Sequence, residues 1–264
     1  MLARQYFTHL SYRVCIVAVN ERRHPHPQLA THSIRAAFVL ILIFAQLNWL
    51  VVLTRTRVHG SNPNDCLHPC ARGAMCTAGA EWVLITAAGS ILGQGVIRMA
   101  RKYGYQTIAV VLSRASAEQL TKLGAIATIA TESEDVVKYV YRVTGGQGVE
   151  RAMDCVGGAT ALAVIQSLAA GGKLVLYVTL TPGPIVLPSR HLMMPVSSVS
   201  GFFLPGWMAQ HGPPKLQGVV RATRRLIAEG YFDTEIAAKF PLSQIHAALA
   251  AAAPGGKKIL LHLQ

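Results

Sequence analysis

The feature that most constrains this chain is a junction at which a buried strand runs into a turn of small residues and then into a helix. WVLIT, at residues 82–86, is a short apolar run typical of a buried strand. Small residues follow in AAGSILG, and Val96, Met99 and Ala100 then recur at helical spacing. This order predicts a strand, turn and helix packed as one unit of a parallel sheet.

From residue 81 onward, short apolar runs alternate with amphipathic stretches. Residues 107–113 and 174–180 are further apolar runs with the Val, Ile and Leu content of buried strands. Alternation of this kind is typical of βαβ units. We therefore expect residues 80–264 to form an α/β domain with a doubly wound parallel sheet, that is, a Rossmann fold.

Residues 1–79 differ in composition and are expected to form an atypical segment of their own. All eight basic residues before residue 81 are Arg, and four of the five Cys lie there. Residues 36–54 carry no charge, and at about 1.5 Å per residue a helix of this length approaches the roughly 30 Å of a bilayer core. A membrane helix therefore stands beside two other interpretations, a buried helix and a stretch without fixed structure.

The sequence gives little support for a metal ion or a nucleic acid as a partner. The Cys and His of CLHPCARGAMC, at residues 66–76, match neither paired CxxC motifs nor a CxxC with an HxxxH, and no metal site is predicted. The net charge of +13 is spread as +6 before residue 81 and +7 after it, without a basic run interleaved with aromatics. The Cys spacing is also not that of a disulfide scaffold, which favours the cytoplasm.

The turn after residue 86 has the chemistry of a phosphate cradle. Small residues let the backbone approach a pyrophosphate and direct the free N–H groups of the next helix at its charge. Because the turn lies between a strand and a helix, nucleotide binding is favoured over simple packing. The residues predicted to line the cradle are Ala88, Gly89, Ser90, Ile91, Leu92 and Gly93.

The next predicted strand ends at Ser113 and Arg114, where the adenosine ribose of a dinucleotide would lie. A carboxylate here selects NAD, whereas a guanidinium can hold the 2′-phosphate of NADP. No acidic residue follows until Glu118. NADPH is therefore the predicted cofactor, and an Arg solvated at a strand end is the alternative.

Together these segments resemble the medium-chain dehydrogenase/reductase superfamily, and within it the zinc-independent quinone oxidoreductases and trans-2-enoyl thioester reductases. The likeness is carried by AAGSILGQGVIRMARKYG, EQLTKLGA, VTGGQGVERAMDCVGG, GGKLVLY, SGFFL and FPLSQIHAALAAAAPGGKKILL. It implies a six-stranded Rossmann domain that holds NADPH across the carboxyl ends of its strands. It does not extend to residues 1–79, which show no strand pattern long enough for the superfamily's GroES-like domain.

The resemblance also implies where the nicotinamide lies. Ile91 and Val178 stand where relatives commonly have Gly, so their β-branched side chains and restricted backbones would have to fit the cofactor. Cys155 is expected to be a buried structural thiol rather than a nucleophile, because no His or cation lies near it in sequence. Contacts are expected, with core packing as the alternative, from Cys155, Val156, Gly157, Tyr177, Val178, Thr179, Phe203 and Leu204.

Two functions follow as hypotheses, neither with an assigned catalytic residue. In the first, the chain is an NADPH-dependent oxidoreductase that transfers hydride to an activated alkene or quinone. In the second, it is a truncated nucleotide-binding module without catalytic activity, which residues 36–54 could tether to a membrane. The resemblance further implies a homodimer joined through a sixth strand at residues 196–204.

Overall fold

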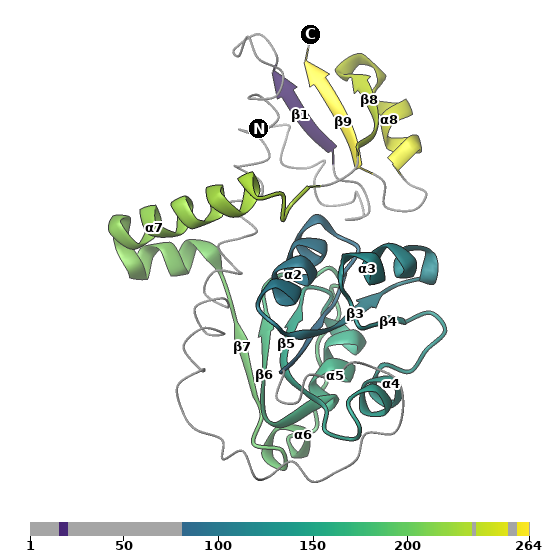
Figure 1. Cartoon of the computed structure of the whole chain (residues 1–264), viewed down its shortest axis with the longest axis vertical. Helices are drawn as coiled ribbons and strands as arrows, with labels where there is room; N and C mark the ends of the chain where they lie inside the picture. Colours follow the sequence, from purple (N-terminus) through teal and green to yellow (C-terminus); the bar gives the residue numbers. More distant parts are fainter. Residues whose placement is uncertain (1–15, 21–80, 234–235, 253–257, 264) are drawn as a thin grey trace. The chain divides into compact units, whose positions relative to one another are not determined.

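The computed structural model (Figure 1) describes residues 16–20, 81–233, 236–252 and 258–263. They divide between two compact units: residues 81–219 lie in one, and β1 (Ile16–Asn20) with the described part of residues 220–264 lies in the other. The apolar segment 36–54 and the Cys and His cluster at 66–76 lie outside the described residues. Among the helices that are described, none is both long and apolar enough to cross a bilayer.

The first unit is built on a six-stranded parallel sheet in the order β4-β3-β2-β5-β6-β7. The strand order reverses between β2 and β5, and a sheet of this kind opens a crevice at the carboxyl ends of its strands at such a switch point. The predicted doubly wound parallel sheet is thus confirmed for this unit. Its strands are β2 (Trp82–Ile85), β3 (Gln106–Val111), β4 (Ala127–Ala130), β5 (Val149–Asp154), β6 (Leu168–Leu176) and β7 (Ser198–Gly201).

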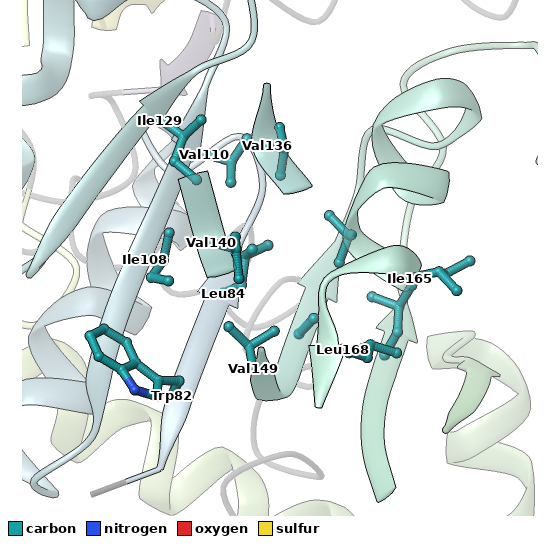
Figure 2. Close-up of a cluster of buried hydrophobic side chains, with 13 residues drawn as sticks. Trp82, Leu84, Ile108, Val110, Ile129, Val136, Val140, Val149, Ile165 and Leu168 are labelled. Carbon is teal, nitrogen blue, oxygen red and sulfur yellow. The ribbon is translucent and has the colours of Figure 1, made fainter. Parts of the chain in front are cut away.

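Helices cover both faces of this sheet (Figure 1). Trp82 and Leu84 belong to a core cluster formed with residues of α4 and α5 (Figure 2), whereas the equally buried Val83 and Ile85 do not. Because both faces are buried here, β2 is apolar along its whole length instead of alternating. The helices of this unit are α2 (Ile91–Lys102), α3 (Ala117–Leu123), α4 (Val136–Val143), α5 (Gly158–Gln166), α6 (Arg190–Met193) and the first part of α7 (Leu204–Ala228), with the short helix η3 (Arg114–Ser116).

Two strands that carry predicted site residues are shorter than expected. β3 ends at Val111, so Arg114 lies beyond it and begins η3. The predicted strand at 196–204 is reduced to β7, and Leu204 begins α7. Val196 has a φ of 53°, a left-handed conformation that does not continue a strand.

The second unit contains a separate parallel sheet in the order β1-β9-β8. β9 (Lys258–Leu263) pairs with β1 and with β8 (Ile236–Pro241), and α8 (Ile245–Ala252) contacts β8 and β9. Ala248, Ile259 and Leu261 form its buried core. β1 was not predicted, because residues 1–79 show no alternating strand pattern of adequate length. That residues 1–79 form a segment of their own stays a prediction.

Candidate functional site

The turn between β2 and α2 lies tightly against the first turn of the helix. Ser90 caps α2 from an extended backbone, and its hydroxyl accepts a hydrogen bond from the Gly93 N–H at 3.0 Å. A Cβ on Gly93 would lie 2.6 Å from the Cα and the carbonyl oxygen of Ala88, closer than real atoms approach. Glycine is therefore required at residue 93 for the helix to come so near the turn.

The N-terminus of α2 presents backbone N–H groups that no acceptor among the described residues satisfies. The Ser90 N–H donates to the Ala87 carbonyl at 2.9 Å. By contrast, no acceptor within the described residues receives the N–H groups of Gly89, Ile91 and Leu92. Unpaired donors at the positive end of a helix dipole form an anion site. This end of α2 is therefore chemically suited to hold a phosphate group.

The β-branched residues at 91 and 178 do not strain the backbone. Ile91 is the first residue of α2, and neither Ile91 nor Val178 has a positive φ. Their backbones therefore lie in regions that β-branched residues adopt readily. The residue of the turn with a positive φ is Ala87, at 46°. Backbone strain in this turn thus lies two residues after the end of β2, at a position that was not predicted from the sequence.

A buried carboxylate joins the carboxyl ends of β2 and β5. Asp154 is fully buried and accepts hydrogen bonds from the Thr86 hydroxyl at 2.7 Å and from the N–H groups of Val156 and Gly157 at 3.2 and 2.8 Å. The Thr86 hydroxyl in turn accepts the Cys155 N–H at 3.1 Å. These bonds fix the loop that follows β5. Thr86 and Asp154 were not among the predicted site residues, although each is a polar residue at the carboxyl end of a strand.

The loop after β6 is bonded to the loop after β5. The Leu180 N–H donates to the Cys155 carbonyl at 2.9 Å. Thr181 donates twice to the Val156 carbonyl, from its N–H at 2.9 Å and from its hydroxyl at 2.6 Å. The structure therefore brings these two loops together at the carboxyl edge, beside the switch point.

Cys155 and Tyr177 place two neutral groups in this region. Cys155 is a free, buried cysteine. Burial raises the pKa of its thiol, and a hydrogen bond with Tyr177 partly offsets that effect. Burial also raises the pKa of the Tyr177 phenol well above its ordinary value. Both groups are protonated at neutral pH, which agrees with a structural thiol at residue 155 and not with a nucleophile.

At the other side of the site, an ion pair follows β3 and β4. Nη2 of Arg114 lies 2.5 Å from Oε1 of Glu134. The Ala130 N–H lowers the pKa of Glu134, burial opposes this, and Arg114 adds a smaller lowering, so the carboxylate is ionised at neutral pH. The hydroxyl of Ser113 makes no capping bond to η3. Glu134 was missed because it lies 20 residues from Arg114 in the sequence.

Phe203 and Leu204 lie at the end of the site opposite Arg114. The Phe202 N–H donates to the Leu176 carbonyl at 2.7 Å, so the chain after β7 emerges beside the end of β6. Phe203 is 73% exposed. β3 and β7 are separated by β2, β5 and β6, a distance of about 19 Å at the usual strand spacing. The predicted residues thus form an elongated row along the carboxyl edge, not one cluster.

Comparisons with known proteins agree with this geometry. Residues 92–221 match the family model described as zinc-binding dehydrogenase. Within the part of the chain that the structure describes, no group of three or more His, Cys, Asp or Glu is placed to hold a metal ion.

Individual relatives are reductases. The mitochondrial enoyl-[acyl-carrier-protein] reductase of Homo sapiens is 28% identical over 173 residues, which cover 64% of this chain and 46% of that protein. The Arabidopsis thaliana enzyme of the same name is 33% identical over 151 residues, covering 55% and 38%. The chain spans less than half the length of these two relatives. 

A solved structure of an oxidoreductase is also similar to this chain. The Escherichia coli quinone oxidoreductase complexed with NADPH is 25% identical and has a TM-score of 0.58, covering 68% of this chain and 56% of that one. The strand order, the turn before α2 and these matches all point to one family. The chain therefore belongs to the medium-chain dehydrogenase/reductase superfamily, whose C-terminal domain it contains.

Proposed function

We propose that the six-stranded unit binds NADPH along its carboxyl edge and that the chain is an NADPH-dependent oxidoreductase. The observation that carries this proposal is the N-terminus of α2, where the N–H groups of Ile91 and Leu92 find no acceptor among the described residues. Gly93 keeps the adjacent turn close to the helix. A pyrophosphate would satisfy these donors at the positive end of the dipole. The likeness to a quinone oxidoreductase solved with NADPH supports the same cofactor.

The remaining residues of the carboxyl edge suit the other parts of this elongated cofactor. Ser113 and Arg114, after β3, would lie by the ribose that carries the 2′-phosphate. The loops after β5, β6 and β7 would lie by the nicotinamide, on the far side of the switch point. Their proposed contacts are Cys155, Val156, Gly157, Tyr177, Val178, Thr179, Phe203 and Leu204.

The bound cofactor would supply a hydride, and we propose an activated alkene or a quinone as the acceptor. This choice rests on the likeness to enoyl-[acyl-carrier-protein] reductases and to a quinone oxidoreductase. The chain itself would orient the cofactor and exclude water. The bond between Thr86 and Asp154 holds the loop after β5, and the protonated Cys155 and Tyr177 add no charge beside it.

Ile91→Pro tests the phosphate cradle. Proline is favoured at the first position of a helix, and Ser90 before it is already extended, with φ −69° and ψ 161°, so the helix should survive while one N–H is removed. We expect the affinity for NADPH and NADH alike to fall about tenfold, because both carry the pyrophosphate. Fluorescence titration of the whole chain measures both affinities. Ile91→Ala keeps the N–H and is the matched control; equal affinities of the two variants would contradict the cradle.

Turnover distinguishes the two functional hypotheses. After the titration, the same samples receive a panel of quinones and 2-enals, and oxidation of NADPH is followed by its absorbance. Binding with oxidation supports the oxidoreductase. Binding without oxidation by any acceptor supports a nucleotide-binding module that lacks catalytic activity. If neither NADPH nor NADH binds, the proposal is wrong.

We further propose a homodimer that forms through β7. This strand lies at the edge of the sheet, pairs only with β6 among the described strands, and is largely exposed. An edge strand of this kind has unpaired backbone groups that a second copy can bond. Light scattering after size-exclusion chromatography should give twice the chain mass, and a strictly monomeric mass would contradict the dimer.

A membrane tether at residues 36–54 is a separate proposal, which equal solubility with and without detergent would contradict.

A further inference from the structure

Arg114 and Glu134 lie at one corner of the proposed site, beyond two neighbouring strands. β3 and β4 are paired, with Val111 opposite Ala130. The Thr131 N–H donates to the Val111 carbonyl at 2.9 Å, so the pairing continues past the end of β4. The segments that carry the two charged side chains therefore emerge side by side at the carboxyl edge.

The two charged partners are held with different rigidity. Glu134 is bound twice to Ala130: its N–H donates to the Ala130 carbonyl at 2.9 Å, and its Oε2 accepts the Ala130 N–H at 2.8 Å. The side chain of Glu134 is 17% exposed, whereas that of Arg114 is 60% exposed. The carboxylate is therefore the fixed charge of the pair, and the guanidinium is the partner that is free to move.

The ion pair lies close to the proposed phosphate cradle. A Cβ on Gly89 would lie 3.6 Å from the hydroxyl oxygen of Ser116, the last residue of η3, so η3 packs beside the turn before α2. A 2′-phosphate that reached Arg114 would meet the carboxylate of Glu134 as well. The guanidinium attracts a dianion and the carboxylate repels it. Glu134 also accepts a hydrogen bond from Nη2 of Arg114, and a bidentate interaction with phosphate would need that donor.

We propose that Glu134 is a specificity-determining residue, which competes with the 2′-phosphate of NADPH for Arg114 and so narrows the preference for NADPH over NADH. The inference rests on the proposed nucleotide binding and adds the basis of cofactor selection. Arg114 attracts the 2′-phosphate, and Glu134 offsets part of that attraction. The chain should therefore accept both nucleotides, with a smaller difference in affinity than Arg114 alone would produce.

Glu134→Gln in the whole chain tests this. Glutamine keeps an oxygen that can accept the Ala130 N–H and removes the charge. We expect the affinities for NADPH and for adenosine 2′,5′-bisphosphate to rise about fivefold while that for NADH stays constant. In an Arg114→Gln background the same substitution should bring a smaller gain, because it then relieves only the direct repulsion of the phosphate, and the double-mutant cycle isolates the coupling between the two residues.

Glu118→Gln is the matched control. It removes the same charge from an exposed ion pair with Lys122 on α3. The inference is overturned if Glu134→Gln changes NADPH and NADH affinity equally or not at all, or if Glu118→Gln gives the same gain. Binding of both nucleotides in those cases leaves the proposed function standing. If no variant binds either nucleotide while circular dichroism shows folded protein, both proposals are wrong.

Discussion

The same two strands, β2 and β5, carry different chemistry at their two ends. Near the amino ends, the buried Arg151 pairs with Glu81 at 3.3 Å, and Glu150 accepts the Trp82 N–H at 2.7 Å. At the carboxyl ends, the carboxylate of Asp154 is surrounded by one hydroxyl and two backbone N–H donors. One end is stabilised by opposite charges and the other by neutral donors.

The difference separates the part of the sheet that holds the fold from the part suited to bind a ligand. At the amino ends, Arg151 and Glu81 neutralise each other. At the carboxyl ends, the local donors satisfy Asp154, and the N–H groups at the start of α2 are left over for an outside anion. A parallel sheet gathers all its carboxyl ends at one edge, so a site of several loops forms only there. Four predictions test this comparison.

Gly93→Ala should have the largest effect, because its Cβ would overlap the backbone of Ala88 at 2.6 Å. We expect the free energy of unfolding to fall by about 3 kcal/mol, measured by urea denaturation. Gly218→Ala on α7 is the control, since a Cβ there meets nothing within 4 Å. Equal stability of the two variants would show that the turn at the carboxyl edge is not tightly packed.

Asp154→Asn should have the next largest effect. An amide nitrogen in place of either carboxylate oxygen would face a donor, so we expect a loss of about 2 kcal/mol in unfolding free energy together with weaker nucleotide binding. Glu81→Gln removes one charge from the amino end of the same two strands, where Glu81 is partly exposed. It should lower stability less and leave nucleotide affinity unchanged. If both variants lose affinity alike, the assignment of binding to the carboxyl edge is wrong.

The two edges should also respond to pH with opposite sign. Burial raises the pKa of Glu150, so the folded chain holds this proton more tightly than the unfolded chain. Protonated Glu150 therefore favours the folded chain. The unfolding free energy falls as the pH rises from the ordinary pKa of a glutamate through the raised pKa of Glu150 in the folded chain. The pKa of Glu134 is lowered, chiefly by the Ala130 N–H. Its stabilising contribution is therefore present above its ordinary pKa and is lost as pH falls through its folded pKa.

Denaturation of Glu150→Gln and Glu134→Gln from about pH 3 to pH 7 measures these slopes against the unsubstituted chain. Glu150→Gln should remove a decrease in stability with rising pH, and Glu134→Gln should remove an increase. Changes of the same sign in both variants would contradict the difference between the two edges.

Ala87→Gly should have the smallest effect. The φ of 46° at Ala87 costs free energy that glycine avoids, and the greater entropy of glycine in the unfolded chain offsets part of this gain. We expect a net stabilisation of about 0.5 kcal/mol in urea denaturation. Ala88→Gly is the control, because Ala88 is buried and has no positive φ, and it should destabilise. A loss from both substitutions would show that Ala87 is not strained.

Local patterns were enough to predict the strand, turn and helix at the cradle. The apolar run at β2 and the small residues at 90 and 93 act within a few positions of one another. The resemblance to the superfamily predicted cofactor contacts in the loops after β5 and β6. The structure joins these loops by the hydrogen bond from the Leu180 N–H to the Cys155 carbonyl. The absence of nearby cations predicted the buried thiol of Cys155, which the structure also shows.

What the sequence by itself determined is therefore local: where the first strand of the six-stranded sheet lies, where the chain turns after it, and which helix begins with free donors. The tertiary structure alone decided the partners. Thr86 bonds Asp154 across 68 residues, Arg114 pairs with Glu134 across 20, and Ile16 lies opposite Ile259. The physical reason is that periodicity and backbone freedom are properties of consecutive residues. Hydrogen bonds and ion pairs between strand ends depend on which strands become neighbours, and that is fixed only when the sheet packs.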